Sequence, residues 1–281
     1  MKHQDIKTMK LYHHLDRIDR RLKELGYSTT DVVDPEQLGT VDSLHFFGDE
    51  PIRHIEELLT KTPSGNGDKK VLDVGTGFGG TARLLAHRSG CKVDALELQP
   101  DLCEAGKALT RRCGLDDRIS HLNDDFLELV VTPNAYDVVV GLLCFLHIGH
   151  WTELFRRCFE SLKPGGFLYI DDFFLRGEQL TVQDEQTLRE DVYCSELLAR
   201  EKIVSTLTAC GFEEPRFTDV TAKWLPYLSD RSITYHADLA THIALDGEAT
   251  ARELDHFYKR VARLFQAGNV GGYTLIVRKP L

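Results

Sequence analysis

The segment VLDVGTGFGG, residues 71–80, decides the fold of this 281-residue chain. A short apolar run typical of a buried strand leads directly into a turn that is dense in glycine. Because glycine has no side chain and adopts positive φ readily, the backbone amides of such a turn can approach a ligand closely. The spacing of Gly75, Gly77 and Gly80 fits the pattern GxGxxG, a weak motif that nicotinamide sites and other nucleoside sites share. A tight strand-to-helix connection without any ligand is the competing interpretation.

Outward from this segment, short apolar runs alternate with helical patterns. The runs are VLDV (71–74), VDALEL (93–98), ISHL (119–122), YDVVVGLL (136–143) and FLYIDD (167–172). Their β-branched residues and lack of polar alternation predict strands that are covered on both faces. Two further strands are expected near 216–220 and at GGYTLIVRK (271–279), where the last one closes the sheet. The predicted fold class is α/β, a doubly wound, Rossmann-like, mostly parallel sheet with an antiparallel last strand.

The N-terminal part of the chain is predicted to be helical. Leucine and isoleucine recur at spacings of three and four over residues 7–25, which predicts an amphipathic helix that ends at Gly26. Pro51 opens a second helix that runs to about residue 60. The segment KTPSGNGDKK (61–70) combines turn residues with charge and is interpreted as a linker.

These patterns suggest two units. We expect an N-terminal helical extension on the substrate side, residues 1–67, and a main ligand-binding domain, residues 68–281, with a helical insertion at about 222–268. Because an open parallel sheet binds ligands at its carboxyl edge, the extension and the insertion should cover the ligand and frame its pocket.

Charge and cysteine content exclude several classes of protein. The formal net charge is −10 and basic residues are scattered among acidic ones, so no nucleic-acid partner is expected. Seven cysteines form no CxxC pair, which favours reduced thiols in the cytoplasm. Charge interrupts every apolar run near the N-terminus, so neither a signal peptide nor a membrane span is expected. No metal-ligand constellation stands out, and the oligomeric state does not follow from the sequence, a homodimer being one option.

Two acidic positions follow the glycine turn at informative distances. Glu97 ends the next strand some twenty residues after the glycines, where a carboxylate can accept both ribose hydroxyls of a nucleoside. A solvated strand-end acid is the alternative. After the strand 119–122, the residues Asn123, Asp124, Asp125 and Phe126 offer a carboxylate for an adenine amino group and a ring to cover the base. Capping of a helix N-terminus is the competing use, and the two uses can coexist.

The glycine turn, Glu97, the segment 124–126 and the motif LKPGG (162–166) together resemble class I methyltransferases over roughly residues 68–175. In that family LKPGG precedes the fifth strand, and nicotinamide enzymes do not require it. The resemblance implies that the chain binds S-adenosyl-L-methionine and releases S-adenosyl-L-homocysteine. Carried over position by position, Asp73 and Gly75 would hold the methionine end, Glu97 the ribose, and Asp124 with Phe126 the adenine. The implied cofactor-binding set is Asp73, Gly75, Thr76, Gly77, Glu97, Leu98, Asp124, Asp125, Phe126 and Leu142.

Two longer segments carry a narrower likeness. Residues 144–173, which begin CFLHIGHW, and LTACGFEEPRFTDVT at 207–221 are similar to phosphoethanolamine and sarcosine/dimethylglycine N-methyltransferases. In the phosphoethanolamine enzymes the LHI-type motif supplies an active-site histidine, and His147 stands at that position. The resemblance implies that a neutral His147 accepts a proton or fixes a nucleophile close to the transferred methyl group. The alternative is a histidine that begins a helix and hydrogen-bonds to the backbone.

The chain also departs from those enzymes. Leu143 replaces an aspartate that meets the substrate's ammonium group, Phe173 replaces a tyrosine, and the N-terminal tyrosine motif is not recognisable. We therefore expect an acceptor that is less cationic or held differently. The candidate residues for contacting it are His45, Leu143, Asp171, Asp172, Phe173 and Tyr193, each of which could instead be a surface or packing residue.

The predicted function is S-adenosylmethionine-dependent methylation of a small molecule, with N-methylation of a small amine or amino acid as the first choice. Transfer to oxygen, sulfur or carbon of a less polar molecule is the alternative within the same fold, because Leu143, Phe145 and Phe173 permit an apolar pocket. A non-catalytic module that only holds the cofactor or its product is the alternative from another class. A nicotinamide oxidoreductase is a third interpretation.

Overall fold

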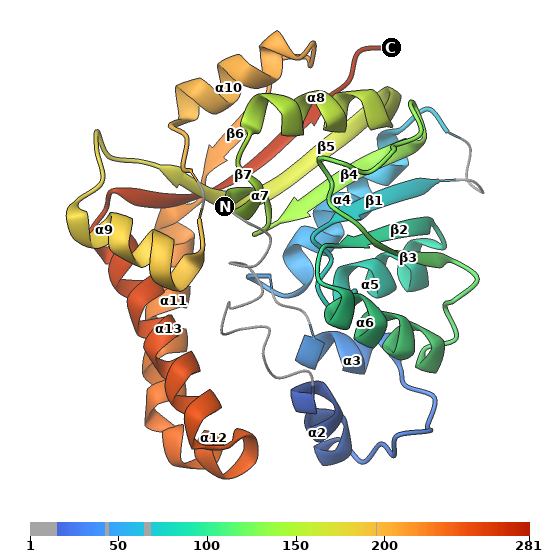
Figure 1. Cartoon of the computed structure of the whole chain (residues 1–281). Helices are drawn as coiled ribbons and strands as arrows, with labels where there is room; N and C mark the ends of the chain where they lie inside the picture. The colour runs from blue at the N-terminus through green and yellow to red at the C-terminus, as the bar shows by residue number, and fades with distance from the viewer. Residues whose placement is uncertain (1–15, 43–44, 65–68, 195) are drawn as a thin grey trace.

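The computed structural model describes residues 16–42, 45–64, 69–194 and 196–281. Over these residues, seven strands form one sheet in the order β3-β2-β1-β4-β5-β7-β6. Strands β1 to β5 run parallel, and β7 is antiparallel to both β5 and β6 (Figure 1). The predicted fold class is therefore confirmed. The strands are β1 (Lys70–Val74), β2 (Lys92–Glu97), β3 (Ile119–Asn123), β4 (Tyr136–Leu142), β5 (Leu162–Leu175), β6 (Arg216–Asp219) and β7 (Val270–Arg278).

Helices cover both faces of this sheet, and further helices stand beside its carboxyl edge (Figure 1). Before β1 and between the parallel strands lie α2 (Asp16–Glu24), α3 (Pro35–Asp42), α4 (Asp49–Lys61), α5 (Gly80–Ser89), α6 (Pro100–Arg112), α7 (Phe145–Ile148) and α8 (Trp151–Ser161). After β5 come α9 (Val182–Thr187), the π-helix η2 (Leu188–Val192), α10 (Arg200–Ala209), α11 (Thr221–Ala237), α12 (Leu239–Asp246) and α13 (Glu248–Gln266). None of the helices described is both long and apolar enough to cross a bilayer.

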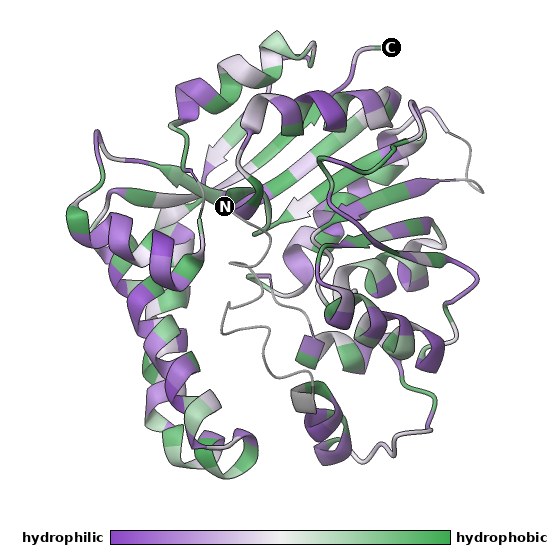
Figure 2. Cartoon of the chain, in the orientation of Figure 1, coloured by the Kyte–Doolittle hydropathy of each residue, from purple (hydrophilic) through white to green (hydrophobic). Residues whose placement is uncertain are grey.

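The strands form because their apolar residues can be buried on both faces. Residues of α4 and α5 pack on one face of β1 and β4, and residues of α8 and α10 pack on the other. Figure 2 shows the strands as mostly hydrophobic and the outer helices as two-sided. From β1 the chain builds β2 and β3 on one side and then crosses to β4 and β5 on the other. In such sheets this reversal marks the ligand-binding crevice, which here lies at the carboxyl ends of β1 and β4.

Several local details differ from the sequence-based expectations. The motif LKPGG does not precede β5 but forms its first residues, because Leu162 already pairs with Tyr136 before a register shift. The last strand does not close the edge of the sheet but inserts between β5 and β6. Helix α4 begins at Asp49, two residues before Pro51. Of the amphipathic helix predicted over 7–25, residues 16–24 are helical, and residues 7–15 lie outside the described part. The division of the chain at residue 67 stays a prediction.

Helix α11 packs directly on the last strand. A Cβ atom at Gly272 would lie 2.2 Å from Cε3 of Trp224, and one at Gly271 would lie 2.4 Å from Oγ1 of Thr221. The absence of side chains at these two glycines therefore lets the first turns of α11 approach the sheet. This contact fixes where the helices α11 to α13 stand beside the carboxyl edge (Figure 1).

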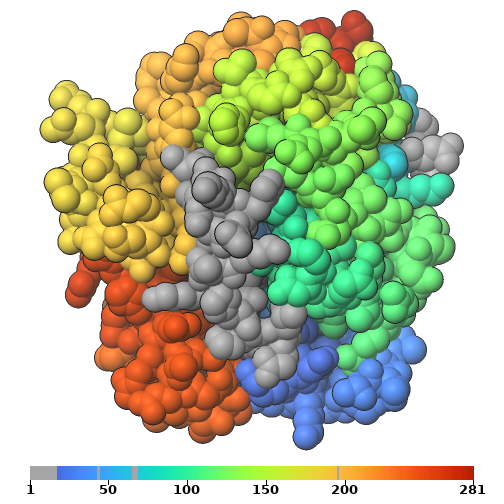
Figure 3. All heavy atoms as spheres, in the orientation of Figure 1, coloured from blue at the N-terminus to red at the C-terminus, as the bar shows by residue number. Residues whose placement is uncertain are grey.

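The far end of this helical group meets the N-terminal part of the chain. Asp246, at the end of α12, lies 3.5 Å from Arg20 and 3.6 Å from Arg21 of α2 between charged atoms. In the space-filling view, the orange-red C-terminal helices and the blue N-terminal helix touch at the foot of the molecule (Figure 3). Helix α2 near the N-terminus and helix α12 near the C-terminus are thus in contact with each other.

Candidate active site

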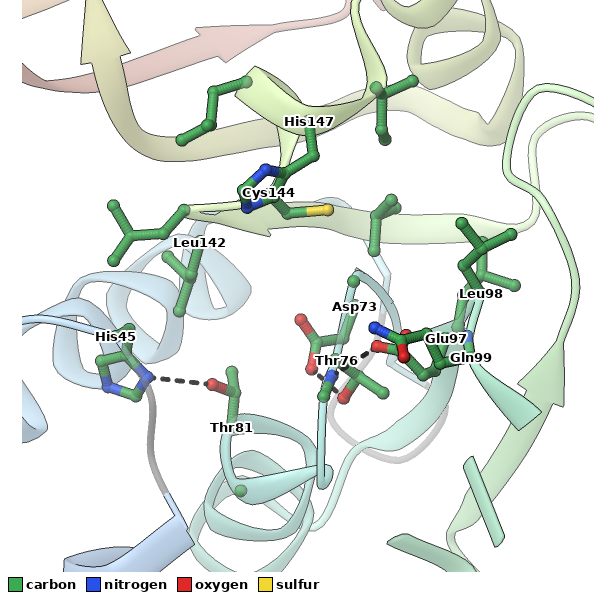
Figure 4. A pocket seen from close by; sticks show the side chains of 18 of the residues that line it. His45, Asp73, Thr76, Thr81, Glu97, Leu98, Gln99, Leu142, Cys144 and His147 are labelled. Carbon is green, nitrogen blue, oxygen red and sulfur yellow. Dashed lines mark hydrogen bonds between the residues drawn. The ribbon is translucent and has the colours of Figure 1, made fainter. Parts of the chain in front are cut away.

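A large pocket opens at the carboxyl edge of the sheet. The space not filled by atoms is about 1480 Å³, including the part open to solvent. Its walls come from the ends of β1, β2 and β4, from the start of α5 and from α7 (Figure 4). The helices α3, α11 and α13 contribute further lining residues. Among the described residues, no three histidine, cysteine or acidic side chains converge as metal ligands.

The glycine turn after β1 forms one wall of the pocket. Gly75 and Gly77 have φ values of +71° and +58°, which residues with side chains rarely adopt. A Cβ atom at Gly75 would lie 2.1 Å from Sγ of Cys144, so only glycine fits there. The hydroxyl of Thr76 donates a hydrogen bond of 2.5 Å to Asp73, whose burial raises its pKa to about 6. The turn is therefore held in shape by the hydrogen bond between Thr76 and Asp73 and by packing against Cys144, which follows β4.

Glu97 ends β2 beside this turn and is buried. Its two carboxyl oxygens accept backbone N–H groups at 2.9 Å, one from Gly77 and one from Gln99. Burial raises the pKa of Glu97 to about 7, against the effect of these two hydrogen bonds. A carboxylate in this position ties β2 to the glycine turn and presents acceptor lone pairs to the pocket.

The segment after β3 closes the same end of the pocket. Asp125 accepts the N–H of Leu127 at 2.8 Å and so caps the turn that follows it, while Asp124 is exposed at the rim. Phe126 is buried, and the guanidinium of Arg157 lies 5.8 Å from its ring centroid. The capping use and a place in the pocket wall therefore coexist here.

His147 lies on the short helix α7 and lines the pocket (Figure 4). Its Nδ1 lies 3.1 Å from the backbone carbonyl of Tyr193, and a carbonyl can only accept a hydrogen bond. Nδ1 therefore carries the proton, and Nε2 is left with a lone pair. Burial lowers the pKa of His147, which keeps the ring neutral.

A second neutral histidine lies across the pocket. His45 has its Nε2 at 2.8 Å from the carbonyl of Gly48, so Nε2 is the protonated nitrogen and Nδ1 the acceptor. The hydroxyl of Thr81 lies 3.4 Å from that Nδ1 (Figure 4). Burial lowers the pKa of His45. This residue is held by α5 and by the chain between α3 and α4.

Most of the residues predicted from sequence lie in the pocket wall. All ten residues of the implied cofactor set line it, and so do His45, Leu143, His147 and Phe173. Leu143 adopts a φ of +52°, a strained conformation of the kind that gathers at ligand sites. Asp171, Asp172 and Tyr193 are not among the lining residues. Their roles as acceptor contacts stay predictions.

Asp172 is instead covered by α7. Its carboxylate accepts the N–H of Leu146 at 3.0 Å and the N–H of Phe173 at 2.8 Å. Burial raises its pKa to about 7. Asp172 therefore anchors the helix that carries His147. Tyr193 acts on His147 as well, because its backbone carbonyl accepts the hydrogen bond from Nδ1.

Sequence reasoning did not single out a further group of residues that line the pocket. They are Asp42, Phe46, Thr81, Cys144, Leu146, Val192, Arg231, Phe257, Tyr258 and Val261. Asp42, Phe46 and the residues after 190 lie outside every motif, and tertiary packing sets their place at the pocket. Thr81, Cys144 and Leu146 lie beside or within the quoted motifs, but nothing in those motifs indicated that they line the pocket. The ring of Phe46, for example, lies 4.9 Å from that of Trp224, across 178 residues of sequence.

Asp171 lies just outside the pocket in a polar network under α4. It accepts hydrogen bonds from Thr274 at 2.6 Å and from Tyr169 at 3.0 Å, and His54 lies 3.2 Å from the same tyrosine hydroxyl. Burial raises the pKa of Asp171 from 3.8 to about 6. The folded protein therefore holds this proton more tightly than the unfolded chain does, and the stability it gives at low pH is lost as pH rises through about 6.

We expect Asp171→Asn to remove this part of the pH dependence. Both neighbouring hydroxyls can reorient to suit an amide, so the variant keeps its hydrogen bonds. When the pH rises from 5 to 8, the free energy of unfolding should fall by about 1 kcal/mol less in the variant than in the parent. Urea unfolding at several pH values measures the difference, with the exposed Asp116→Asn as a control that should follow the parent. If the free energy of unfolding depends on pH in the Asp171 variant as it does in the parent, this carboxyl is already ionised in the folded protein at pH 5.

The sheet order, the glycine turn at its switch point and the acid that ends β2 define a class I methyltransferase fold. Residues 71–166 match the family model described as a methyltransferase domain. The resemblance to class I methyltransferases that the motifs indicated is confirmed.

Curated relatives agree with this family. The chain is 28% identical over 179 residues to sarcosine/dimethylglycine N-methyltransferase of Halorhodospira halochloris, covering 62% of this chain and 63% of the relative. It is 29% identical over 169 residues to sterol 24-C-methyltransferase of Eremothecium gossypii, covering 56% and 45% respectively. The chain thus spans less than two thirds of the length of either relative.

A solved structure shares the fold. Haemonchus contortus phosphoethanolamine N-methyltransferase 2, in complex with phosphomonomethylethanolamine and S-adenosylhomocysteine, superposes with a TM-score of 0.70 at 23% identity. The match covers 81% of this chain and 53% of that one.

Proposed function

We propose that this protein is an S-adenosylmethionine-dependent methyltransferase that acts on a small molecule, first of all by N-methylation of an amine or amino acid. The observation that carries the proposal is the meeting of the glycine turn, Glu97 and His147 in one pocket at the switch point of the sheet. The curated sarcosine/dimethylglycine N-methyltransferase and the methyltransferase domain match support it.

The residues present suit S-adenosylmethionine. The glycine turn lines the pocket at Gly75 and Gly77, where no side chain covers the main chain, and Glu97 offers two oxygens to a ribose. The buried ring of Phe126 offers an apolar surface to an adenine, with Asp124 at the rim. When bound, this cofactor supplies a methyl group that is already activated by its positively charged sulfur.

The protein's own part is positioning, exclusion of water and proton removal. An amine acceptor reacts through its nitrogen lone pair, so its ammonium form must first lose a proton. Nε2 of His147 accepts that proton, because Nδ1 is committed to the carbonyl of Tyr193 and burial keeps the ring neutral. The apolar side chains of Leu143, Leu146 and Phe173 keep water away from the reacting atoms.

A second acceptor chemistry has an observation in its favour. Around His147 the pocket wall is mostly apolar, formed by Phe46, Leu143, Leu146 and Phe173. Such a wall suits oxygen, sulfur or carbon of a less polar molecule, and one curated relative is named as a sterol 24-C-methyltransferase. An acceptor screen with labelled cofactor separates these chemistries by product.

The test uses the full-length protein, labelled S-adenosylmethionine and pools of amines, amino acids and apolar acids. We expect labelled product with the parent, and a kcat about 10²- to 10⁴-fold lower for His147→Ala on an amine acceptor. The affinity for S-adenosylhomocysteine should stay within about threefold, since His147 is not assigned to the cofactor. His87→Ala, an exposed histidine of α5, is the matched control.

Two outcomes would contradict parts of this proposal. If His147→Ala turns over the true acceptor nearly as fast as the parent, the histidine has no chemical role. If the parent binds S-adenosylhomocysteine but labels no acceptor, a non-catalytic module that holds the nucleoside is the better description.

We further propose a cytoplasmic setting and a small molecule as the only class of substrate. Seven free cysteines and the absence of a basic stripe in a chain of net charge −10 support this. A homodimer remains one option for its assembly, to be decided by sedimentation.

A further inference from the structure

In the described part of the pocket wall, one permanent cation lies beside α13, at what we call the acceptor end. Among the described residues that line the pocket, Arg231 is the single lysine or arginine. Carboxylates gather instead at the glycine-turn end, where Asp73, Glu97, Asp124 and Asp125 line the wall. Around Arg231 the wall is apolar or aromatic, with Phe257, Tyr258 and Val261 of α13.

The helix face that carries Arg231 is directed toward the acceptor region. Trp224 and Tyr227 of α11 contact the ring of Phe46, with centroid distances of 4.9 Å and 5.6 Å. Arg231 follows Tyr227 by four residues and Trp224 by seven, so it lies on the same face one helical turn further on. The anchoring of α11 on Gly271 and Gly272 holds this face in place.

The guanidinium of Arg231 is positioned but not neutralised. Its Nη2 donates a hydrogen bond of 3.0 Å to the hydroxyl of Tyr258, and its central carbon lies 4.3 Å from that ring's centroid. It forms no ion pair within the described parts of the chain. On α13, by contrast, Arg260 is paired with Asp191 at 2.9 Å and Lys259 with Asp255 at 2.8 Å.

We propose that Arg231 binds an anionic group of the methyl acceptor, and that this group is the single carboxylate of an amino acid or other acid whose body is apolar. The proposal rests on the proposed function, since it concerns the second substrate of the same site. A stacked, half-buried guanidinium has its N–H donors in a fixed plane, which matches the two oxygens of a carboxylate. Tyr258 keeps that plane in one orientation.

The charge of the surroundings favours a carboxylate over a phosphate. One guanidinium balances one negative charge, whereas a phosphate monoester carries nearly two. The uncompensated charge would lie in a pocket that already holds several carboxylates, and no second lysine or arginine lines it in the described chain. The apolar wall suits the body of the molecule, which lies between this group and His147.

The test titrates octanoate, 1-octanol and octyl phosphate into full-length protein saturated with S-adenosylhomocysteine, by calorimetry below their micellar concentrations. We expect octanoate to bind the parent at least tenfold more tightly than 1-octanol. Arg231→Gln should remove that difference while leaving the affinity for 1-octanol and for S-adenosylhomocysteine unchanged. Arg231→Lys should keep part of it, and Arg252→Gln, an exposed arginine of α13, should behave as the parent.

Each other outcome overturns the proposal. Equal binding of octanoate by the parent and by Arg231→Gln would remove the assigned role, as would a failure of octanoate to bind the parent. Tighter binding of octyl phosphate than of octanoate would replace the carboxylate by a phosphate. If S-adenosylhomocysteine itself does not bind the parent, the proposed function fails, and the same titrations without it still decide the role of Arg231.

Discussion

Glu97→Ala is expected to weaken binding of S-adenosylhomocysteine by at least a hundredfold. The carboxylate would accept both ribose hydroxyls, and hydrogen bonds to a charged group contribute about 1.5–3 kcal/mol each. The variant also leaves the N–H groups of Gly77 and Gln99 without the oxygens that now accept them. Isothermal titration calorimetry at pH 8, above the pKa of about 7, measures the loss with the carboxylate ionised.

A nearby acid provides the control for this experiment. Glu104 lies on the exposed side of α6 and pairs with Lys107, so Glu104→Ala should bind S-adenosylhomocysteine as the parent does. Thermal unfolding of both variants confirms that they are folded. If Glu97→Ala binds the nucleoside within a few-fold of the parent, the assigned ribose contact is wrong and the proposed cofactor loses its main support.

Arg83→Met is expected to lower the free energy of unfolding by about 3–5 kcal/mol, because it removes one partner of a buried ion pair. Arg83 and Asp42 are 1% and 0% exposed in their side chains, and Arg83 also donates to the carbonyl of Phe78 at 2.7 Å. Burial already raises the pKa of Asp42 although the guanidinium opposes it. Without that guanidinium, the carboxylate is left in the core with no counter-charge.

The same helix offers the control. Arg88 of α5 pairs with Glu36 and Asp49 at the surface, where ion pairs contribute about 1 kcal/mol or less, so Arg88→Met should be close to neutral. Urea unfolding measures both variants. The double variant Arg83→Met with Asp42→Leu should recover most of the loss, and an equal loss in the double variant would show that packing rather than charge is responsible.

The parts of the site that the sequence predicted are those set by local chemistry and by the rules of parallel sheets. Gly75 and Gly77 predict the turn because only glycine adopts its backbone conformation readily. Glu97 could be predicted because β2 must end beside that turn, which places its last residue next to the ligand. The alternation of apolar runs was enough to predict the doubly wound sheet, whereas its antiparallel last strand belongs to the fold of the family that the chain resembles. The position of β7 between β5 and β6 depends on contacts made after the chain has returned from three helices, and no local pattern encodes it.

The acceptor side could not be predicted in the same way. Asp171 and Asp172 are neighbours on one strand, so they point to opposite faces, and the sequence does not say which face holds the ligand. One joins a network under α4 and the other anchors α7. Arg231 and Tyr258 reach the pocket only because α11 packs on two glycines of β7. Such contacts are decided by tertiary packing.

The bond between His147 and Tyr193 uses a main-chain oxygen, which every amino acid carries. Exchange of the side chain at this position would leave the tautomer of the imidazole intact, provided that the backbone keeps its left-handed conformation of φ +57°. Asparagine and glycine adopt that conformation most readily. Related chains can therefore differ at residue 193 and still share the same protonation state at their histidine, so variability there is no sign of a lost function.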